Sequence, residues 1–249
     1  MTAPSGSTWT DLRVAITGGT SGLGLALVEA LANRGARIAF VARGADRVQA
    51  VARQNPGTHG IVGDISRKET TYPIAMQLTA ALGGLDLLIN NASSLGPVPL
   101  RLLADTDCED LEAALATNLV GPFRLTKALL GALAAGAREG RRPALVINIS
   151  SDAAVTPYPG WGAYGASKAG LLHLSRIWNE ELRPHSVRVV AFDPGDMDTP
   201  LHALAVPDTD PATLKRPADS ALELLAVVEA HFPQSTFRAS PVHSVATAS

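Results

Sequence analysis

The chain has 249 residues and a formal net charge of −2, and 46% of its residues are hydrophobic. This composition is typical of a folded globular domain and excludes a disordered chain, and it provides no basic field to attract nucleic acid or an anionic membrane. The single cysteine, Cys108, excludes an intrachain disulfide framework, and no apolar run reaches the ~20 residues of a membrane-spanning helix. Because the first dozen residues do not resemble a signal peptide, we expect a cytoplasmic protein.

Short apolar runs alternate with longer helical patterns, which is typical of repeated β–α units. The predicted strands span residues 13–17, 37–42, 59–63, 86–91, 144–149 and 187–193. The predicted helices span residues 23–33, 43–53, 66–82, 107–135, 161–182 and 219–230. Ser66 is the predicted N-cap of the third helix, a break is expected near Gly121 and Pro122, and residues 136–143 are interpreted as a loop. The order of these elements predicts an α/β fold, a doubly wound parallel sheet of the Rossmann type in a single domain.

We expect residues 12–240 to form this domain, between a flexible N-terminal segment, 1–11, and a tail, 241–249. Residues 197–217 are rich in Pro, Asp and Ala and lack a clear periodic pattern. Long irregular stretches in compact domains are usually functional. We therefore interpret residues 197–217 as a lid over a substrate cleft.

The turn after the first strand, residues 17–24, has the sequence TGGTSGLG. Glycines let a backbone turn sharply and approach a pyrophosphate at the positive end of the following helix. A turn that only packs a helix against a strand is the alternative, but the position between a strand and an amphipathic helix favours dinucleotide binding. The predicted cofactor contacts in this turn are Gly18, Thr20, Ser21, Gly22, Leu23 and Gly24.

The second strand ends in Val41-Ala42-Arg43, without an acidic residue. A carboxylate at this position would bind the ribose 2′-hydroxyl of NAD, whereas the planar guanidinium of Arg43 suits the 2′-phosphate of NADP. The alternative is a solvated loop arginine. We expect NADP(H) as the cofactor, with NAD(H) as the alternative.

Tyr164 and Lys168 lie four residues apart on one face of a predicted helix. A tyrosine normally has a pKa near 10, and a nearby cation lowers it toward the range of acid–base catalysis. The same spacing also occurs in surface pairs. The preceding predicted strand ends in Ser150-Ser151, shortly before this helix, and that position favours a catalytic pair.

Taken together, these motifs resemble those of the short-chain dehydrogenase/reductase (SDR) family, in its single-domain form of about 250 residues. Beyond the motifs above, the resemblance extends to Asp64, NNAS at 90–93, Asn118 in NLVGPF, NISS at 148–151 and DPGDMDT at 193–199. The chain departs from the family pattern at Ser93, where a glycine is usual. It departs again in residues 236–249, where no seventh strand is recognisable.

The resemblance implies catalytic roles for four residues. Tyr164 would donate a proton to the substrate oxygen in reduction, or accept one in oxidation, and Ser151 would hydrogen-bond that oxygen. Lys168 would bind the nicotinamide ribose and lower the pKa of Tyr164. Asn118 would hold a water that links Lys168 to solvent, or would satisfy only the local backbone, or both.

The resemblance also implies cofactor contacts at the ends of later strands. These are Asp64 and Ile65 at the adenine, Asn91 at the adenosine ribose or the adjacent backbone, Tyr164 and Lys168 at the nicotinamide ribose, and Pro194, Gly195 and Thr199 at the nicotinamide. No metal site is expected, because the six histidines show no ligand spacing.

The expected function is therefore an NADP(H)-dependent oxidoreductase for a small carbonyl or alcohol substrate, assembled as a homodimer or homotetramer. A non-catalytic dinucleotide sensor is the alternative from another class, and the intact Ser151, Tyr164 and Lys168 argue against it. A medium-sized apolar substrate is suggested by the side chains Pro97, Leu100, Val155, Tyr158, Trp161, Leu201 and Leu204.

Overall fold

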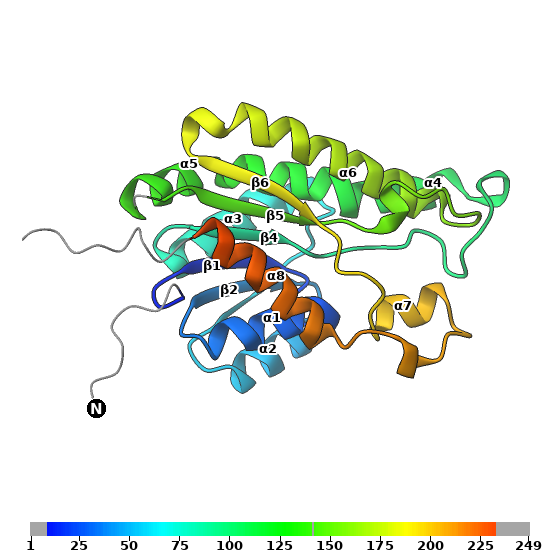
Figure 1. The fold of residues 1–249 in the computed structure, drawn as a ribbon, viewed down its shortest axis with the longest axis horizontal. Coiled ribbons are helices and arrows are strands. Elements are labelled where there is room, and N and C mark those ends of the chain that lie inside the picture. Colours follow the sequence, from blue (N-terminus) through cyan, green and yellow to red (C-terminus); the bar gives the residue numbers. More distant parts are fainter. Residues whose placement is uncertain (1–8, 141, 233–249) are drawn as a thin grey trace, which may run out of the picture.

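Six parallel strands form one sheet between two layers of helices (Figure 1). The computed structural model describes residues 9–140 and 142–232. The strand order is β3-β2-β1-β4-β5-β6, which is the doubly wound arrangement expected from the sequence. The strands are β1 (Arg13–Thr17), β2 (Arg37–Ala42), β3 (His59–Val62), β4 (Leu87–Asn90), β5 (Ala144–Ile149) and β6 (Val187–Phe192).

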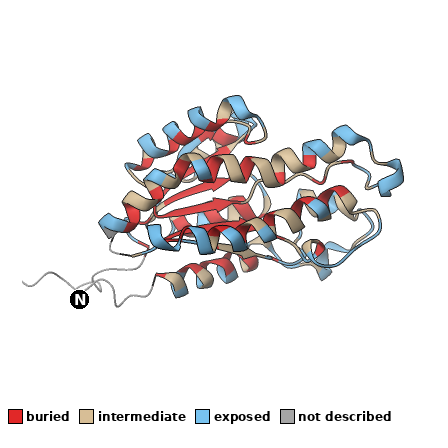
Figure 2. Cartoon of the chain, turned by 90° about the horizontal axis from the view of Figure 1, so that it is seen from above, coloured by how far each residue is buried: buried red, intermediate tan, exposed pale blue. Residues whose placement is uncertain are grey.

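The inner strands β1, β2, β4 and β5 are apolar on both faces because helices cover the sheet on both sides. On β1, Val14 and Ile16 belong to one hydrophobic cluster, whereas Ala15, between them, belongs to the other. Figure 2 shows buried residues on the strands and on the inner sides of the helices. This two-sided burial explains why the strands appear in the sequence as continuous apolar runs.

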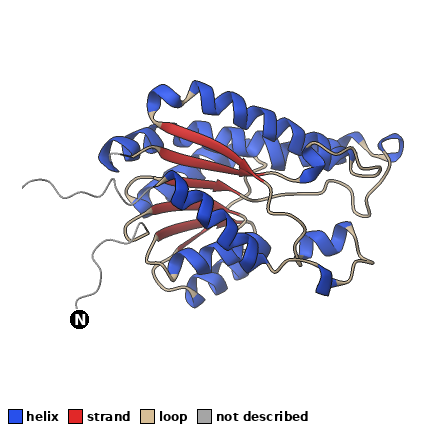
Figure 3. Cartoon of the chain, in the orientation of Figure 1, coloured by secondary structure: helices blue, strands red, loops and turns tan. Residues whose placement is uncertain are grey.

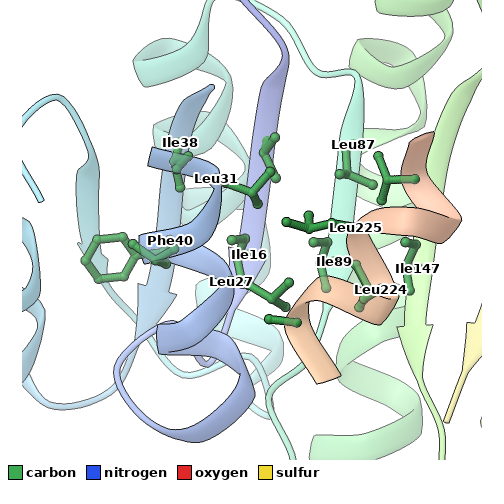
Figure 4. Close-up of a cluster of buried hydrophobic side chains, with 14 of the residues drawn as sticks. Ile16, Leu27, Leu31, Ile38, Phe40, Leu87, Ile89, Ile147, Leu224 and Leu225 are labelled. Atoms are coloured by element: carbon green, nitrogen blue, oxygen red, sulfur yellow. The ribbon is translucent and has the colours of Figure 1, made fainter. Parts of the chain in front are cut away.

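One layer contains α1 (Gly22–Ala32), α2 (Ala45–Gln54) and α8 (Pro217–His231). Figure 4 shows side chains of α1 and α8, among them Leu27 and Leu224, against the strand residues Ile16 and Ile89. The opposite layer contains α3 (Lys68–Leu82), α5 (Gly121–Gly140) and α6 (Gly162–Glu181). Within the described residues, no helix is both long and apolar enough to cross a bilayer.

The core starts earlier than the predicted domain boundary at residue 12. Trp9 is buried in the hydrophobic cluster that α1 and α8 form with the sheet, and its indole N–H donates a hydrogen bond to Glu229 on α8 (3.0 Å). Residues 9–11 are thus part of the fold, rather than of a flexible segment. Residues 1–8, the predicted tail at 241–249 and the unrecognised strand region at 236–249 lie outside the described residues.

The predicted helix at 107–135 is three helical pieces in succession. They are α4 (Cys108–Leu115), a π-helix (Ala116–Val120) and α5, which starts at Gly121. The predicted break near Gly121 and Pro122 takes the form of this π-helix, which ends at Val120, while the backbone stays helical through Gly121 and Pro122. Pro122 is the second residue of α5, where a proline costs little, and the irregularity lies one turn earlier.

Two other local predictions are corrected by contacts with distant or neighbouring residues. The predicted loop at 136–143 is helical up to Gly140, because Glu139 pairs with Arg13 of β1 (3.0 Å) and Ala137 is buried. Ser66 does not cap α3: its hydroxyl donates to Asp64 (2.7 Å), and the N-cap of α3 is Arg67.

The segment 197–217 is mostly loop, but it contains one short helix, α7 (Pro200–Ala205) (Figure 3). In Figure 1, α7 lies apart from both helical layers, on the side where β6 ends. The two ends of the segment lie side by side, because Met197 forms a parallel β-bridge with Lys215. The Lys215 ammonium also binds the Glu223 carboxylate of α8 (2.8 Å). The remaining short turns are 3₁₀ helices at Leu103–Asp105, Asp152–Ala154, Arg183–His185 and Pro211–Thr213.

Candidate active site

A cleft of about 980 Å³ lies at the carboxyl ends of the strands. The sheet order reverses between β1 and β4, and at such a point the chain leaves the two strands in opposite directions and opens a crevice. Most of the predicted site residues line this cleft: Gly18, Thr20, Ser21, Gly22, Leu23, Arg43, Asp64, Ile65, Asn91, Ser151, Tyr164, Lys168, Pro194, Gly195 and Thr199. Two predicted residues, Gly24 and Asn118, do not line it.

The glycine turn after β1 is tightly packed on the chain after β4. Gly18 has a φ of +72°, and a Cβ there would lie 2.9 Å from the Cα of Ala92. A Cβ on Gly24 would lie 2.1 Å from the carbonyl oxygen of Gly18, so Gly24 packs the helix onto the turn. Asn91 fixes the same turn, because its amide donates to the carbonyls of Thr17 (2.9 Å) and Gly18 (3.2 Å).

The turn presents the N-terminus of α1 to the cleft. The first N–H groups of a helix have no partner within the helix and carry a partial positive charge. The first turn of α1 has no acidic residue, and the N-cap Ser21 makes no side-chain cap bond. These features fit a bound pyrophosphate.

The end of the cleft where the sequence predicts adenosine binding, called the adenosine end below, is formed after β2 and β3. Arg43 and Arg47 are both exposed and both line the cleft. The Asp64 carboxylate accepts hydrogen bonds from the backbone N–H (2.9 Å) and the hydroxyl (2.7 Å) of Ser66. This end thus combines two guanidinium groups with one carboxylate that is held in place by its neighbour.

At the opposite end, Tyr164 and Lys168 lie one turn apart on α6, and both are buried: 8% of Tyr164 and 2% of Lys168 is exposed. The Lys168 ammonium donates to the carbonyl of Ile149 (2.7 Å) and lies 5.4 Å from the centre of the Tyr164 ring. Burial lowers the pKa of Lys168 to about 8, and the nearby Asp193 partly opposes this change.

Burial also raises the pKa of Tyr164 to about 12, whereas the sequence predicted a lowered pKa. Loss of solvent penalises the phenolate and outweighs the influence of the Ser151 and Ser93 hydroxyls, which act in the opposite direction, toward a lower pKa. The structure therefore keeps Tyr164 protonated at neutral pH.

Ser151 follows β5, and its hydroxyl is already engaged. It donates to the carboxylate of Asp152 (2.9 Å) and accepts from the backbone N–H of Ala153 (3.2 Å). The other oxygen of Asp152 accepts from the Tyr158 hydroxyl (2.7 Å), and this bond lowers the pKa of Asp152. The sequence analysis missed this network, although the position of Asp152 next to Ser151 was a signal for it.

Asn118 is buried in the π-helix, away from the cleft. Its side-chain oxygen accepts from the backbone N–H of Ser94 (2.8 Å), and its side-chain nitrogen donates to the carbonyl of Ser94 (2.7 Å) and to the hydroxyl of Ser167 (2.8 Å). The amide therefore satisfies the local backbone, as the alternative interpretation expected. The water relay stays a prediction.

The lid lies close to the glycine turn. A Cβ on Gly22 would lie 3.0 Å from the methyl group of Thr199, and the Thr199 hydroxyl caps α7 by accepting from the N–H of His202 (3.2 Å). On the adjoining loop, the carbonyl of Pro194 accepts from Ser220 of α8 (2.9 Å). Thr199 of residues 197–217 thus lies against the start of α1, and the loop before this segment is bonded to α8.

The substrate end is less apolar than the sequence suggested. Tyr158, Trp161, Leu201 and Leu204 line the cleft, but the other three predicted side chains do not: Pro97, Leu100 and Val155. Asp152, Asp193, Asp196 and His202 line it as well. In the described part of the chain, no group of three or more His, Cys, Asp or Glu side chains is arranged to hold a metal ion.

Comparison with known proteins agrees with this architecture. The family model described as short chain dehydrogenase matches residues 13–210. An uncharacterized oxidoreductase of Mycobacterium tuberculosis is 35% identical over 193 residues, which cover 76% of this chain and 70% of that protein. Serine 3-dehydrogenase of Agrobacterium fabrum is 32% identical over 188 residues, with 75% and 72% covered.

Among solved structures, the 3-ketoacyl-(acyl-carrier-protein) reductase of Brucella melitensis, complexed with NADH, superposes with a TM-score of 0.81. It is 25% identical, and the match covers 92% of this chain and 94% of that one. The sheet order, the glycine turn and the Tyr164–Lys168 pair occur together with a family match over most of the chain. The chain belongs to the short-chain dehydrogenase family of oxidoreductases.

Proposed function

We propose that the protein is an NADP(H)-dependent oxidoreductase that interconverts a carbonyl and an alcohol, with Tyr164 as general acid or base. One observation carries the proposal: the glycine turn and the group Ser151, Tyr164 and Lys168 line the same cleft. The turn fits a dinucleotide because its glycines allow close approach to a helix N-terminus that carries no acidic residue. When bound, the nicotinamide supplies or accepts the hydride.

The side chains at the reactive end handle the proton and the developing charge. With a pKa of about 12, Tyr164 holds its proton at neutral pH and is ready to donate it to the oxygen of a carbonyl that is being reduced. The Lys168 ammonium, close to the ring, favours the phenolate that remains. Ser151 turns its hydroxyl from Asp152 toward the substrate oxygen and stabilises the charge there.

Arg43 supports the preference for NADP(H). It lies at the end of β2 with Arg47 nearby, and two guanidinium groups favour a 2′-phosphate over a free hydroxyl. The Brucella relative was solved with NADH, so an NAD(H)-dependent dehydrogenase is the alternative. Affinity for the two nucleotides separates these functions.

A small carbonyl or alcohol compound is the substrate in this proposal, and Asp152 and Tyr158 give its pocket a polar side. We also propose a homodimer or homotetramer that forms through the helices that carry Asn118 and Tyr164. Ile177, which is exposed on α6, supports that surface. Sedimentation of the purified chain tests the oligomeric state.

The test of function combines binding and turnover. Purified protein is titrated with NADPH and with NADH, and turnover is then measured on a panel of carbonyl compounds for the wild type and Tyr164→Phe. Tighter binding of NADPH, together with turnover that requires the phenol, supports the proposal. Failure to bind either nucleotide overturns it, and binding without any turnover favours the dinucleotide sensor.

A further inference from the structure

Asp152 is an exposed carboxylate at the reactive end of the cleft, next to Ser151. One of its oxygens accepts from the Ser151 hydroxyl (2.9 Å) and from the N–H of Ala153 (2.7 Å). The other oxygen accepts from the Tyr158 hydroxyl (2.7 Å). The proposed function uses Ser151 but gives no role to the carboxylate that Ser151 touches.

The proposed reaction changes the hydrogen bonds of this carboxylate. Ser151 has one hydroxyl proton, so a Ser151 that donates to the substrate oxygen no longer donates to Asp152. The reacting carbonyl oxygen accepts from Ser151 and Tyr164 and has no proton to offer in exchange. A substrate that covers Asp152 must therefore bring a donor of its own, because an ionised oxygen shielded from water without a partner is unfavourable.

The distances place that donor next to the reacting carbon. The Ser151 hydroxyl oxygen and the nearer Asp152 oxygen are 2.9 Å apart. Polar atoms on neighbouring carbon atoms are separated by a similar distance when they lie on the same side of the bond that joins those carbons. An oxygen bound to Ser151 and a donor bound to Asp152 thus match the spacing of substituents on adjacent carbons.

The charge at this end of the cleft favours a cationic donor. Asp152 lines it together with Asp193 and Asp196, which follow β6. Among the described residues that line the cleft, both arginines lie at the adenosine end, and the one lysine, Lys168, donates to the carbonyl of Ile149 (2.7 Å). The groups bonded to Asp152 are two hydroxyls and a backbone N–H, so these partners leave its negative charge unneutralised.

An aromatic wall stands beside the carboxylate. The ring of Trp161 lies 6.5 Å from that of Tyr158 and 5.7 Å from that of Tyr164, measured between centroids, and Trp161 lines the cleft. The indole thus adjoins both the phenol that binds Asp152 and the phenol of the proposed reaction. Indole is the aromatic ring that attracts cations most strongly, so the wall and the carboxylate favour the same kind of ligand.

We propose that Asp152 determines the substrate class: it selects compounds with an ammonium group on the carbon next to the reacting carbonyl or alcohol. The substrates are then vicinal amino alcohols and the corresponding α-amino ketones. This inference rests on the proposed function and names the substrate class of the same site. Ser151 and Tyr164 bind the reacting oxygen, Asp152 accepts from the ammonium group, and Trp161 forms the wall beside it.

The experiment measures the binding of matched alcohols to the full chain by the NMR signal of the Trp161 indole N–H. The chain has three tryptophans, and Trp161→Phe assigns the signal. The probes are 1-amino-2-propanol and 2-butanol, in which a methyl group replaces the ammonium group. Both are titrated into the protein alone and with NADPH, which cannot oxidise an alcohol. We expect 1-amino-2-propanol to bind about tenfold more tightly, the effect of one hydrogen bond between charged groups.

Two variants and a third probe make the result specific. Asp152→Asn keeps the shape of the side chain but removes its charge, and it is expected to bind both probes with similar affinity. Asp196→Asn is the matched control, because Asp196 also lines the cleft but its side chain is 78% exposed and lies near His202 (3.9 Å). This variant is expected to keep most of the preference. In 4-amino-2-butanol the ammonium group is one carbon further away, and weaker binding to the wild type is expected.

Equal affinity of the wild type for 1-amino-2-propanol and 2-butanol would overturn the inference, and so would the absence of any response to either probe. A preference that survives in Asp152→Asn, an equal loss in Asp196→Asn, or equal binding of 4-amino-2-butanol would also contradict it. The titration of the protein alone requires neither nucleotide nor turnover. A protein that binds the amine through Asp152 but oxidises no alcohol would therefore disprove the proposed function and leave the recognition of the ammonium group in place.

Discussion

The two ends of the cleft carry positive charge in opposite settings. Arg43 and Arg47 are exposed at the adenosine end, whereas Lys168 is buried at the reactive end. An exposed guanidinium stays hydrated, so its interactions are screened by salt and act mainly on what binds. A buried ammonium loses its hydration, and its pKa falls to about 8. In the proposed function, charge of one sign thus selects a ligand at one end and sets protonation at the other.

The largest expected effect is at the buried end. Tyr164→Phe removes the proton donor and leaves the ring that packs against Trp161 (5.7 Å between centroids). Since general acid catalysis contributes about 10²–10⁴-fold, we expect turnover to fall by about 10³-fold with nucleotide affinity nearly unchanged. Steady-state kinetics and nucleotide titration measure the two quantities. If nucleotide affinity fell by as large a factor as turnover, the two ends of the cleft would not have the separate roles described above.

Lys168→Met tests the cost of the buried charge. A folded pKa of about 8, below the usual lysine value of 10.5, means that the charged form destabilises the folded state at neutral pH. The difference corresponds to about 3 kcal/mol, so the variant is expected to be more stable than the wild type at pH 7 and to lose turnover.

The pH dependence of stability gives the sign of this effect. Between about pH 8 and 10.5 the unfolded chain binds more protons at Lys168 than the folded one, so the wild type gains stability from this group as pH rises. The free energy of unfolding, measured with denaturant at pH 7 and pH 9.5, is expected to rise with pH in the wild type. In Lys168→Met this contribution to the rise is expected to be absent. Parallel behaviour of the two proteins would show that Lys168 is hydrated in solution.

Arg43→Ala tests the exposed end. We expect about a tenfold loss of NADPH affinity, the equivalent of one phosphate contact of about 1.4 kcal/mol, with NADH affinity unchanged. The loss is expected to shrink at high salt because the site is exposed. Titrations of both nucleotides at two salt concentrations measure it, and Arg67→Ala, a change at the N-cap of α3, is the control. Equal losses for NADPH and NADH would contradict the role of Arg43 as selector.

The smallest effect is expected at the base of the lid. Lys215 pairs with Glu223, and both side chains are more than 40% exposed. Such pairs contribute about 0–1 kcal/mol, so Lys215→Ala is expected to leave thermal stability almost unchanged. Asp219→Asn, which removes the exposed pair with Arg216, is the matched comparison. A large loss of stability in Lys215→Ala alone would show that the lid is part of the cooperative fold.

The sequence predicted the strands well and the ends of the helices less well. Apolar runs identified β1, β2, β4 and β5 because a sheet that is covered on both sides requires apolar residues on both faces, whereas only Ile61 is buried in the edge strand β3. The end of α5 could not be predicted in the same way. Its last turn is stabilised by the pair between Glu139 and Arg13, residues 126 positions apart, and no local pattern records that contact.

In the candidate site, too, some features depend on local sequence and others on contacts between distant residues. The local sequence determined the glycine turn, the position of Arg43 directly after β2 and the spacing of Tyr164 and Lys168, because each depends on residues that are neighbours along the chain. The tertiary structure alone decided that Tyr164 has a raised pKa and that Asn118 is committed to Ser94 and Ser167. Burial and hydrogen-bond partners arise where distant segments meet, and the same residues acquire their acid–base properties only there.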